Sequence, residues 1–349
     1  MKILKKSLTF LFLVLLINAC ATFKAQYANE KKTLSLKNDA NIEHTFYLIG
    51  DAGNSALGSV HPTLKYLEQE IKDAPKNSTL LFLGDNIYES GVPEEADKNY
   101  ALAKHKIDAQ TAIAKKFNGR PIFIPGNHDW YNGIEGLRRQ EKLVDEALGK
   151  NSFLPERGCP IKRIEISDYI SLIIIDSHWY ITNWDNIPTI NDNCEIKTRD
   201  KFLEKYESYL KKSQGKTTIV AIHHPMFTNG PHAGYYSTKN HLTPLPILGT
   251  MINILRITTG ISNADQQNKK YNELKNRILT LSQNNEKVIF VSGHEHSLQY
   301  LKEFGIPQIV SGAGSKTTGT KLKTADFSYG DNGFAKLTVY KLAIPRKFV

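Results

Sequence analysis

The sequence predicts an α/β domain, in which short buried strands alternate with amphipathic helices. Continuous apolar runs, such as 45–49 and 79–83, are typical of strands that are covered on both faces. Between these runs, apolar residues recur at helical spacing. Several runs end in a glycine that is followed by Asp, Asn or His. Because α/β folds build their sites at the carboxyl ends of strands, these endings also predict where a site lies.

The expected elements follow one another in a regular order. After the first strand at 45–49, a helical pattern extends from Val60 to Ile71. The segment 226–265 interrupts the order because it carries several prolines and glycines, and we expect a long irregular connection with a functional role there. Further strands are expected at 79–83, 121–125, 171–175, 217–222, 287–292, 308–311 and 334–340, and further helices at about 97–117, 201–212 and 266–282.

The first residues are expected to be an export signal. Three lysines precede an apolar run from Leu8 to Ile17, which is too short to span a bilayer comfortably. Cys20 follows a small residue, and the segment resembles a bacterial lipoprotein signal. This resemblance implies cleavage before Cys20 and acylation of the new N-terminus, which would anchor the protein to a membrane. The alternative is an ordinary signal in which Cys20 is incidental.

The chain is therefore expected to comprise a signal peptide at 1–19, a polar tether at 20–43 and one folded domain at 44–349. Cleavage would remove three lysines and no acids, which lowers the formal net charge from +10 to +7. No run of lysines is long enough to indicate nucleic-acid binding. We expect the protein in a bacterial cell envelope, on an outer membrane, facing either the periplasm or the cell surface.

The two remaining cysteines, Cys159 and Cys194, leave two interpretations open. In an exported chain they could form a disulfide, or they could be two unpaired thiols. The sequence does not give the separation of their Cα atoms, on which a bridge depends.

Five short motifs supply the groups that a site with two metal ions needs. Carboxylates bind hard cations, imidazoles bind borderline ones, and one bridging carboxylate holds two ions roughly 3.5–4 Å apart. A single Asp at a strand end could merely cap a helix. The recurrence of such residues after successive strands favours metal binding instead. The motifs are GDAGN at Asp51, GDNIY at Asp85, GNHD at Asn127, HHP at His223 and GHEH at His294.

The histidines in these motifs are expected to differ in role. His294 and His296 lie two residues apart, so both imidazoles share one face of an extended segment. His128 could donate to a phosphate oxygen or make a structural hydrogen bond. Asp129 could fix the tautomer of His128 or cap a helix. His224 points away from its neighbour and is expected in the core or on the surface.

Together the motifs resemble those of the calcineurin-like metallophosphoesterase superfamily, over about residues 46–299. The resemblance is closer to the small, single-domain purple acid phosphatases, in which a tyrosine three residues after the bridging Asp binds ferric iron; Tyr88 matches this position. It implies a four-layer α/β/β/α sandwich of mixed sheets with the site at the carboxyl ends of the strands. It also implies Fe(III) beside Tyr88 and Fe, Zn or Mn in a second site. The implied ligands are Asp51, Asp85, Tyr88 and His296 for the first metal, and Asp85, Asn127, His223 and His294 for the second.

The resemblance implies an acid phosphatase that hydrolyses phosphomonoesters with a metal-bound hydroxide. His128 would contact the phosphate, and His232 would protonate the leaving group. The expected partners are a small phosphorylated substrate and, through Cys20, a membrane. Two alternatives stay open: a phosphodiesterase or nucleotide hydrolase of the same superfamily, and a non-catalytic surface lipoprotein that binds phosphate.

Overall fold

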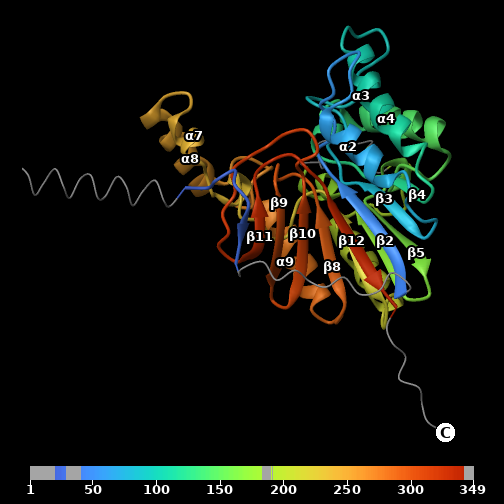
Figure 1. Ribbon diagram of the computed structural model, residues 1–349. Coiled ribbons are helices and arrows are strands. Elements are labelled where there is room, and N and C mark those ends of the chain that lie inside the picture. Colours follow the sequence, from blue (N-terminus) through green and yellow to red (C-terminus); the bar gives the residue numbers. More distant parts are fainter. Residues whose placement is uncertain (1–19, 29–40, 183–189, 191, 342–349) are drawn as a thin grey trace, which may run out of the picture.

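The computed structural model describes residues 20–28, 41–182, 190 and 192–341 (Figure 1). The predicted signal peptide at 1–19 lies outside these residues. Among the helices that the structure describes, none combines the length and the apolar character that crossing a bilayer requires.

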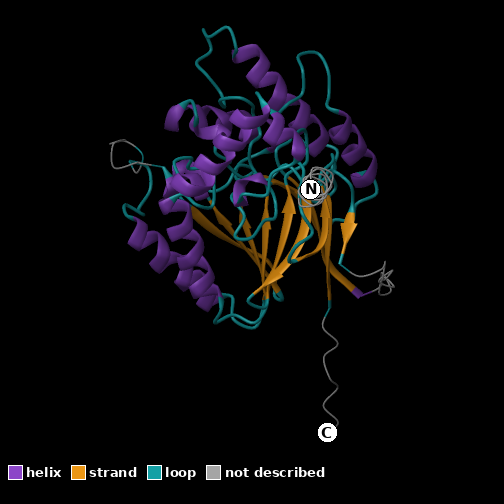
Figure 2. Ribbon diagram, turned by 90° about the vertical axis from the view of Figure 1, so that its left-hand side faces the viewer, coloured by secondary structure: helices purple, strands orange, loops and turns teal. Residues whose placement is uncertain are grey.

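Two mixed β-sheets form the centre of the fold (Figures 1 and 2). In the smaller sheet three strands run parallel and one edge strand is antiparallel. Its order is β12 (Ala335–Tyr340), β2 (Ile42–Ile49), β3 (Ser78–Phe82) and β4 (Arg120–Phe123). The larger sheet has the order β1 (Gln26–Tyr27), β11 (Ala325–Tyr329), β9 (Leu298–Glu303), β10 (Ile306–Ser311), β8 (Val288–Ser292), β7 (Thr217–Ile222), β6 (Ile170–Ile175) and β5 (Ile161–Ser167). Here β10, β8, β7 and β6 are parallel.

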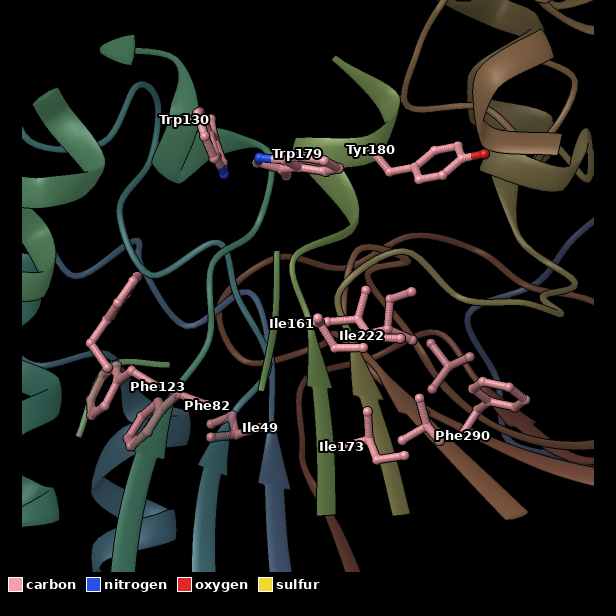
Figure 3. Close-up of a cluster of buried hydrophobic side chains, with 14 of the residues drawn as sticks. Ile49, Phe82, Phe123, Trp130, Ile161, Ile173, Trp179, Tyr180, Ile222 and Phe290 are labelled. Atoms are coloured by element: carbon pink, nitrogen blue, oxygen red, sulfur yellow. The ribbon is translucent and has the colours of Figure 1, made fainter. Parts of the chain in front are cut away.

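Side chains alternate along these strands and so build cores on both faces of each sheet. One core lies between the sheets and joins Phe46 and Leu81 of the smaller sheet to Leu172 and Ile219 of the larger one. On the outer faces the strands pack against helices, and Figure 3 shows Phe82, Phe123 and Ile173 among the side chains involved. These helices are α2 (Pro62–Ile71), α3 (Tyr100–Ala114), α4 (Gly133–Leu148), α5 (Ser177–Ile181), α6 (Arg199–Lys212) and α9 (Lys269–Ser282). The predicted four-layer α/β/β/α sandwich is thereby confirmed.

Each strand and helix predicted above is present, with its ends shifted by a few residues. Helices α4 and α5 were not predicted, although both carry buried residues. Strands β5, β9 and β11 were not predicted, because they are only partly buried and carry charged residues. The expected irregular segment 226–265 also contains two helices, α7 (Thr238–Leu242) and α8 (Pro246–Thr259), so that expectation was wrong for half of its length.

The expected tether is in part docked on the domain. Strand β1 pairs antiparallel with β11 at the edge of the larger sheet. Just upstream, isolated bridges join Ala21 to Ser237 and Thr22 to Thr320. The segment 21–28 is therefore held on the domain, and Gln26–Tyr27 within it forms an edge strand of the larger sheet. Its polar composition is compatible with both a linker and an edge strand, because an edge strand is held through its backbone and keeps one side open.

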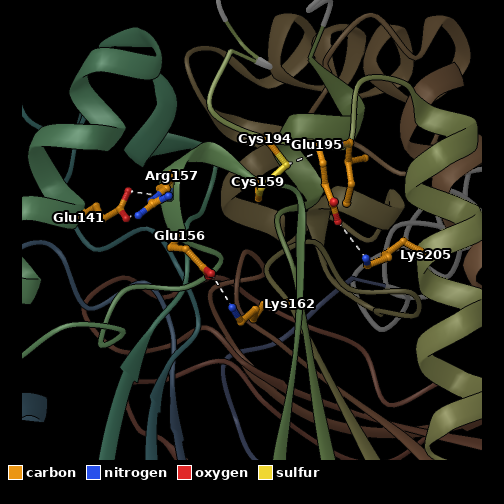
Figure 4. The surroundings of a disulfide bond; sticks show 9 residues. Glu141, Glu156, Arg157, Cys159, Lys162, Cys194, Glu195 and Lys205 are labelled. Atoms are coloured by element: carbon orange, nitrogen blue, oxygen red, sulfur yellow. Dashed lines mark hydrogen bonds and ion pairs between the residues drawn. A yellow bond between two sulfur atoms is a disulfide. The ribbon is translucent and has the colours of Figure 1, made fainter.

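Cys159 and Cys194 form a disulfide, with their Cα atoms 5.2 Å apart (Figure 4). Cys159 lies just before β5, and Cys194 lies just before α6. The bridge thus decides between the two interpretations that the sequence left open, and it fastens the connection between α5 and α6 to the edge of the larger sheet.

Candidate metal centre

Strand ends of both sheets approach one another closely at the candidate centre, and glycines make this approach possible. A Cβ atom on Gly84 would lie 2.6 Å from Nδ1 of His223, which comes from the other sheet. A Cβ atom on Gly126 would lie 2.3 Å from the backbone nitrogen of Asp85. Both contacts are too short for any side chain, so the glycine before each ligand is a packing requirement.

The two aspartates that follow Gly50 and Gly84 are fully buried. Asp51 and Asp85 have φ angles of 58° and 53°, a left-handed conformation that is uncommon for residues other than glycine and occurs often at functional sites. Oδ2 of Asp51 accepts the backbone N–H of His294 at 2.8 Å, and Oδ1 of Asp85 accepts that of His128 at 2.9 Å. Backbone donors from neighbouring motifs therefore fix the orientation of both carboxylates.

The first predicted ligand set converges on the hydroxyl of Tyr88. This hydroxyl lies 2.8 Å from Oδ1 of Asp51, 3.1 Å from Oδ2 of Asp85 and 3.2 Å from Nε2 of His296. Burial, and then the charges of the two aspartates, raise the pKa of Tyr88 well above its usual value. A phenolate at this point therefore requires a strong compensating cation.

The second predicted ligand set also lies together. Nδ1–H of His223 donates to the carbonyl of Leu83 at 2.7 Å, and Nε2–H of His294 donates to that of Ala264 at 2.7 Å. These bonds leave Nε2 of His223 and Nδ1 of His294 facing Oδ1 of Asn127, at 3.1 and 3.0 Å. Such outer hydrogen bonds are the usual way in which ligating imidazoles are oriented toward a metal.

Asp85, which would be shared by the two predicted ligand sets, also lies against the second set. Oδ1 of Asp85 lies 3.3 Å from Nε2 of His223. Burial opposes the imidazolium form, but the Asp85 carboxylate outweighs it and raises the pKa of His223 to about 9. A cation that binds here would replace this proton, so metal binding should release protons from the site.

The donor atoms fit a pair of cations. Atoms of Asp51, Asp85 and His223 lie within 4.8 Å of one another. Burial and the neighbouring imidazoles lower the pKa of His294 well below its usual value, so this ring is neutral. Its Nδ1 then presents a lone pair to the amide oxygen of Asn127, an arrangement that is repulsive unless a cation lies between the two. Carboxylate, amide and imidazole groups are the donors that such borderline cations bind.

His128 lies at the mouth of the centre, where 22% of its side chain is exposed. Its Nδ1 bonds to the carbonyl of Glu89, and its Nε2 lies 4.0 Å from Oδ2 of Asp85. The ring packs between Tyr88 and Tyr131, with centroid distances of 4.5 and 4.7 Å. This placement leaves Nε2 on the side of the ring that faces Asp85.

Asp129 does not fix the tautomer of His128, which the carbonyl of Glu89 does instead. Its Oδ2 accepts the backbone N–H of Gly126 at 2.7 Å, and its Oδ1 accepts that of Asn86 at 3.0 Å. The buried carboxylate therefore joins the loop after β3 to the loop after β4.

His224 was expected either in the core or on the surface, and it lies in the core. It is fully buried, and its Nδ1 is bonded to the hydroxyl of Ser177 at 2.7 Å.

His232 lies against the centre from the segment that follows β7. Its ring stacks on that of His294 with a centroid distance of 4.2 Å. Its Nδ1–H donates to Asp265 at 2.9 Å, and its backbone N–H donates to Glu295 at 3.2 Å. Burial opposes protonation, but Glu295 and Asp265 together raise the pKa of His232. Arg256 of α8 holds the same Asp265 carboxylate, with Nη2 at 2.6 Å.

The carboxylates that hold His232 were not among the residues predicted from the sequence. Glu295 could have been found from the sequence, since it lies between the two histidines of GHEH. In the structure it is fully buried and accepts the backbone N–H of His232. Asp265 and Arg256 lie in the segment taken as irregular and belong to no motif. Only the fold brings them to the site.

The comparisons agree with this fold and centre. Residues 44–312 match the family described as Calcineurin-like phosphoesterase, and the chain belongs to that family. Among curated relatives, Purple acid phosphatase 17 of Arabidopsis thaliana is 23% identical over 286 residues, which cover 80% of this chain and 70% of the relative. Purple acid phosphatase 7 of the same plant is 20% identical over 292 residues, 82% of this chain and 74% of the relative.

Solved structures show the same fold. GAP50, described as the anchor in the inner membrane complex of Plasmodium, superimposes with a TM-score of 0.56 at 17% identity, over 84% of this chain and 80% of its own. PhoD superimposes with a TM-score of 0.52 at 14% identity, over 86% of this chain and 64% of its own.

We expect Asp85→Asn to abolish activity and to lose at least one metal ion per chain, because the Asp85 carboxylate is the group that both ligand sets share. Phosphatase activity should fall by about a thousandfold or more, on the scale of losing a metal's contribution to catalysis. Elemental analysis of the purified protein measures the metal. The exposed Asp73→Asn provides the matched control. Near-normal turnover with two metals retained would contradict the two-metal centre.

Proposed function

We propose that this protein is an exported acid phosphatase that hydrolyses phosphomonoesters with two metal ions. One observation carries the proposal: the Tyr88 hydroxyl lies within 3.2 Å of Asp51, Asp85 and His296, three groups that would bind one cation. Membership of the phosphoesterase family supports a phosphoester hydrolase. The likeness to two purple acid phosphatases supports the finer assignment, in which Fe(III) lies beside Tyr88 and Fe, Zn or Mn in the second position.

The side chains of this site have distinct tasks. When bound, the cations supply a water of lowered pKa and offset the charge of the phosphate. Nδ1–H of His128 donates to the carbonyl of Glu89, so Nε2 would be left to contact a phosphate oxygen. Nδ1–H of His232 donates to Asp265, so Nε2–H would be available to protonate the oxygen of the leaving group.

The environment of His232 suits a general acid. The carboxylates of Glu295 and Asp265 raise its pKa, so the imidazolium persists to a higher pH than that of an ordinary histidine. Protonation of the leaving oxygen matters most when that oxygen is a poor leaving group, as in alkyl esters.

The preference for monoesters is tested with aryl and alkyl monoesters beside a bis-aryl diester, on metal-loaded protein. We expect monoesters to be hydrolysed at least about tenfold faster than the diester. His232→Asn should lower kcat for the alkyl ester much more than for a nitrophenyl ester, whose leaving group needs no acid. His241→Asn, at the more distant helix α7, is the control.

A clear preference for the diester would instead identify a phosphodiesterase or nucleotide hydrolase. Metal-loaded protein that binds phosphate and hydrolyses none of the esters would identify a non-catalytic phosphate binder.

Tyr88 provides a spectroscopic test of the metal. A phenolate bound to Fe(III) absorbs visible light by charge transfer, whereas zinc and magnesium complexes do not. We expect iron-loaded protein to be coloured, Tyr88→Phe to lose the band, and the exposed Tyr66→Phe to keep it. A colourless, fully active wild-type protein without iron would refute the ferric assignment and leave the phosphoesterase assignment standing.

We also propose that Cys20 is acylated and anchors the protein to the membrane of a bacterial cell envelope. The basic start, the apolar run from Leu8 to Ile17 and the small residue before Cys20 support this proposal. Mass spectrometry of the mature protein tests it, with an acyl modification on Cys20 as the expected result and with its loss, or a block in processing, in Cys20→Ser. A mature wild-type protein whose Cys20 carries no acyl group would disprove the proposal, whether or not the protein is found with membranes.

A further inference from the structure

Helices α7 and α8 and the turns that flank them, residues 238–261, form a hairpin that turns apolar side chains outward. We call this unit the apolar hairpin; it projects from the sandwich beside residues 20–28 (Figure 1). The exposed fractions of Ile247 and Ile261 reach 78% and 82%. The exposed apolar residues are Leu242, Leu245, Ile247, Leu248, Met251, Ile252, Ile254, Leu255, Ile257 and Ile261.

The polarity of α8 is reversed relative to an ordinary surface helix. Its buried residues are Gly249 and Asn253, and Arg256 follows on the same face at helical spacing. The opposite face carries Ile247, Met251 and other exposed apolar residues. A helix at the surface of a water-soluble domain normally turns its apolar stripe to the core. Here Gly249 packs against backbone carbonyls in and just after α7, and Arg256 is bonded to Asp265 of the domain. The apolar residues are left on the outer face, where the described part of the chain does not cover them.

Charge is also distributed in an unusual way. Between Leu242 and Ile261, Arg256 is the one residue with a charged side chain. That guanidinium is directed inward, where both Nε and Nη2 bond to Asp265. The outer face of α8 is therefore free of charge along its whole length, which favours contact with a lipid phase over contact with water.

The base of the hairpin meets the start of the described chain. The backbone N–H of Ala21 donates to the carbonyl of Tyr236 at 3.0 Å, and Ala21 bridges to Ser237. Cys20, the predicted site of acylation, directly precedes Ala21 and is therefore placed at the foot of the hairpin. Cys20 and the uncovered apolar face thus lie at the same end of the described domain.

Lysines surround this base. Lys24 and Lys239 are exposed, and Lys323 contacts the hydroxyl of Tyr235. An anionic bilayer has phosphate headgroups above acyl chains, so its headgroups could pair with these lysines while its acyl chains cover the apolar side chains. This match favours lipid over a second protein copy as the partner of the apolar face.

We propose that the apolar hairpin is a membrane-docking element, whose outer face lies in the boundary between the headgroups and acyl chains of an anionic phospholipid bilayer. With 14 residues, α8 is too short to span a bilayer, so it lies along the surface. Docking by the hairpin requires neither the metals nor catalysis. It also does not need an acyl chain on Cys20, although such a chain would enter the same membrane.

The test places an environment-sensitive dye at Met251→Cys in the full chain. Cys159 and Cys194 are joined in a disulfide, and Cys20→Ser removes the other reactive position. Vesicles of phosphatidylethanolamine and phosphatidylglycerol carry spin labels at a shallow acyl position. We expect the dye at 251 to be quenched. A dye at Tyr169→Cys, an exposed position in the turn between β5 and β6, should remain in water and be quenched much less.

A second variant separates docking by the hairpin from binding through the N-terminal apolar run. Ile247→Glu with Ile254→Glu should weaken quenching at 251 at least about tenfold, because both charges would enter the acyl region. Leu57→Glu with Tyr66→Glu changes two exposed apolar residues elsewhere and should leave quenching unchanged. Vesicles without phosphatidylglycerol should quench less, because the lysines at the base then lose their anionic partners.

Three results would overturn the proposal. The dye at 251 could respond to vesicles no more than the dye at 169. It could be shielded before vesicles are added, in which case a second copy or the run from Leu8 to Ile17 covers the face. Finally, the two glutamates could leave quenching unchanged.

Discussion

The architecture depends on bringing two sheets together at the carboxylate of Asp85. This residue ends a strand of the smaller sheet, while His223 reaches it from the larger sheet at 3.3 Å. The approach leaves no room for side chains at Gly84 and Gly126. The apolar core between the sheets holds this separation, so packing far from the centre determines whether the ligands converge. Fold and chemistry are thus coupled through a few close backbone contacts.

The residues of the predicted metal centre could be located from the sequence because they lie in the loops that follow apolar, largely buried strands. Such strands appear in the sequence as continuous apolar runs, and their ends share one edge of the fold. Asp265 lacked that connection, since its role depends on a tertiary contact with His232. Strand β1 was missed for a different reason: an edge strand of two residues is held by backbone hydrogen bonds, which leave no pattern in the side chains.

The apolar hairpin was predictable only in part. Its composition was visible in the sequence, but its prolines and glycines concealed the helix, and periodicity alone does not say which face is outward. In α8 the usual inference would place the isoleucines in the core. In the structure Asn253 is buried on the inward face instead, and Arg256 on the same side binds a buried carboxylate. This ion pair favours the observed orientation of a largely apolar helix.

The ion pair between Arg256 and Asp265 also connects helix α8 to the metal centre. Arg256 and His232 share one carboxylate, so a rotation of α8 about its axis moves Asp265 and, with it, the ring that stacks on His294. The helix that faces outward is thus two side chains away from the catalytic centre. A surface that holds the outer face of α8 would therefore also hold Asp265 and the His232 ring, and we expect turnover by the protein free in solution to differ from turnover by the protein held at a surface.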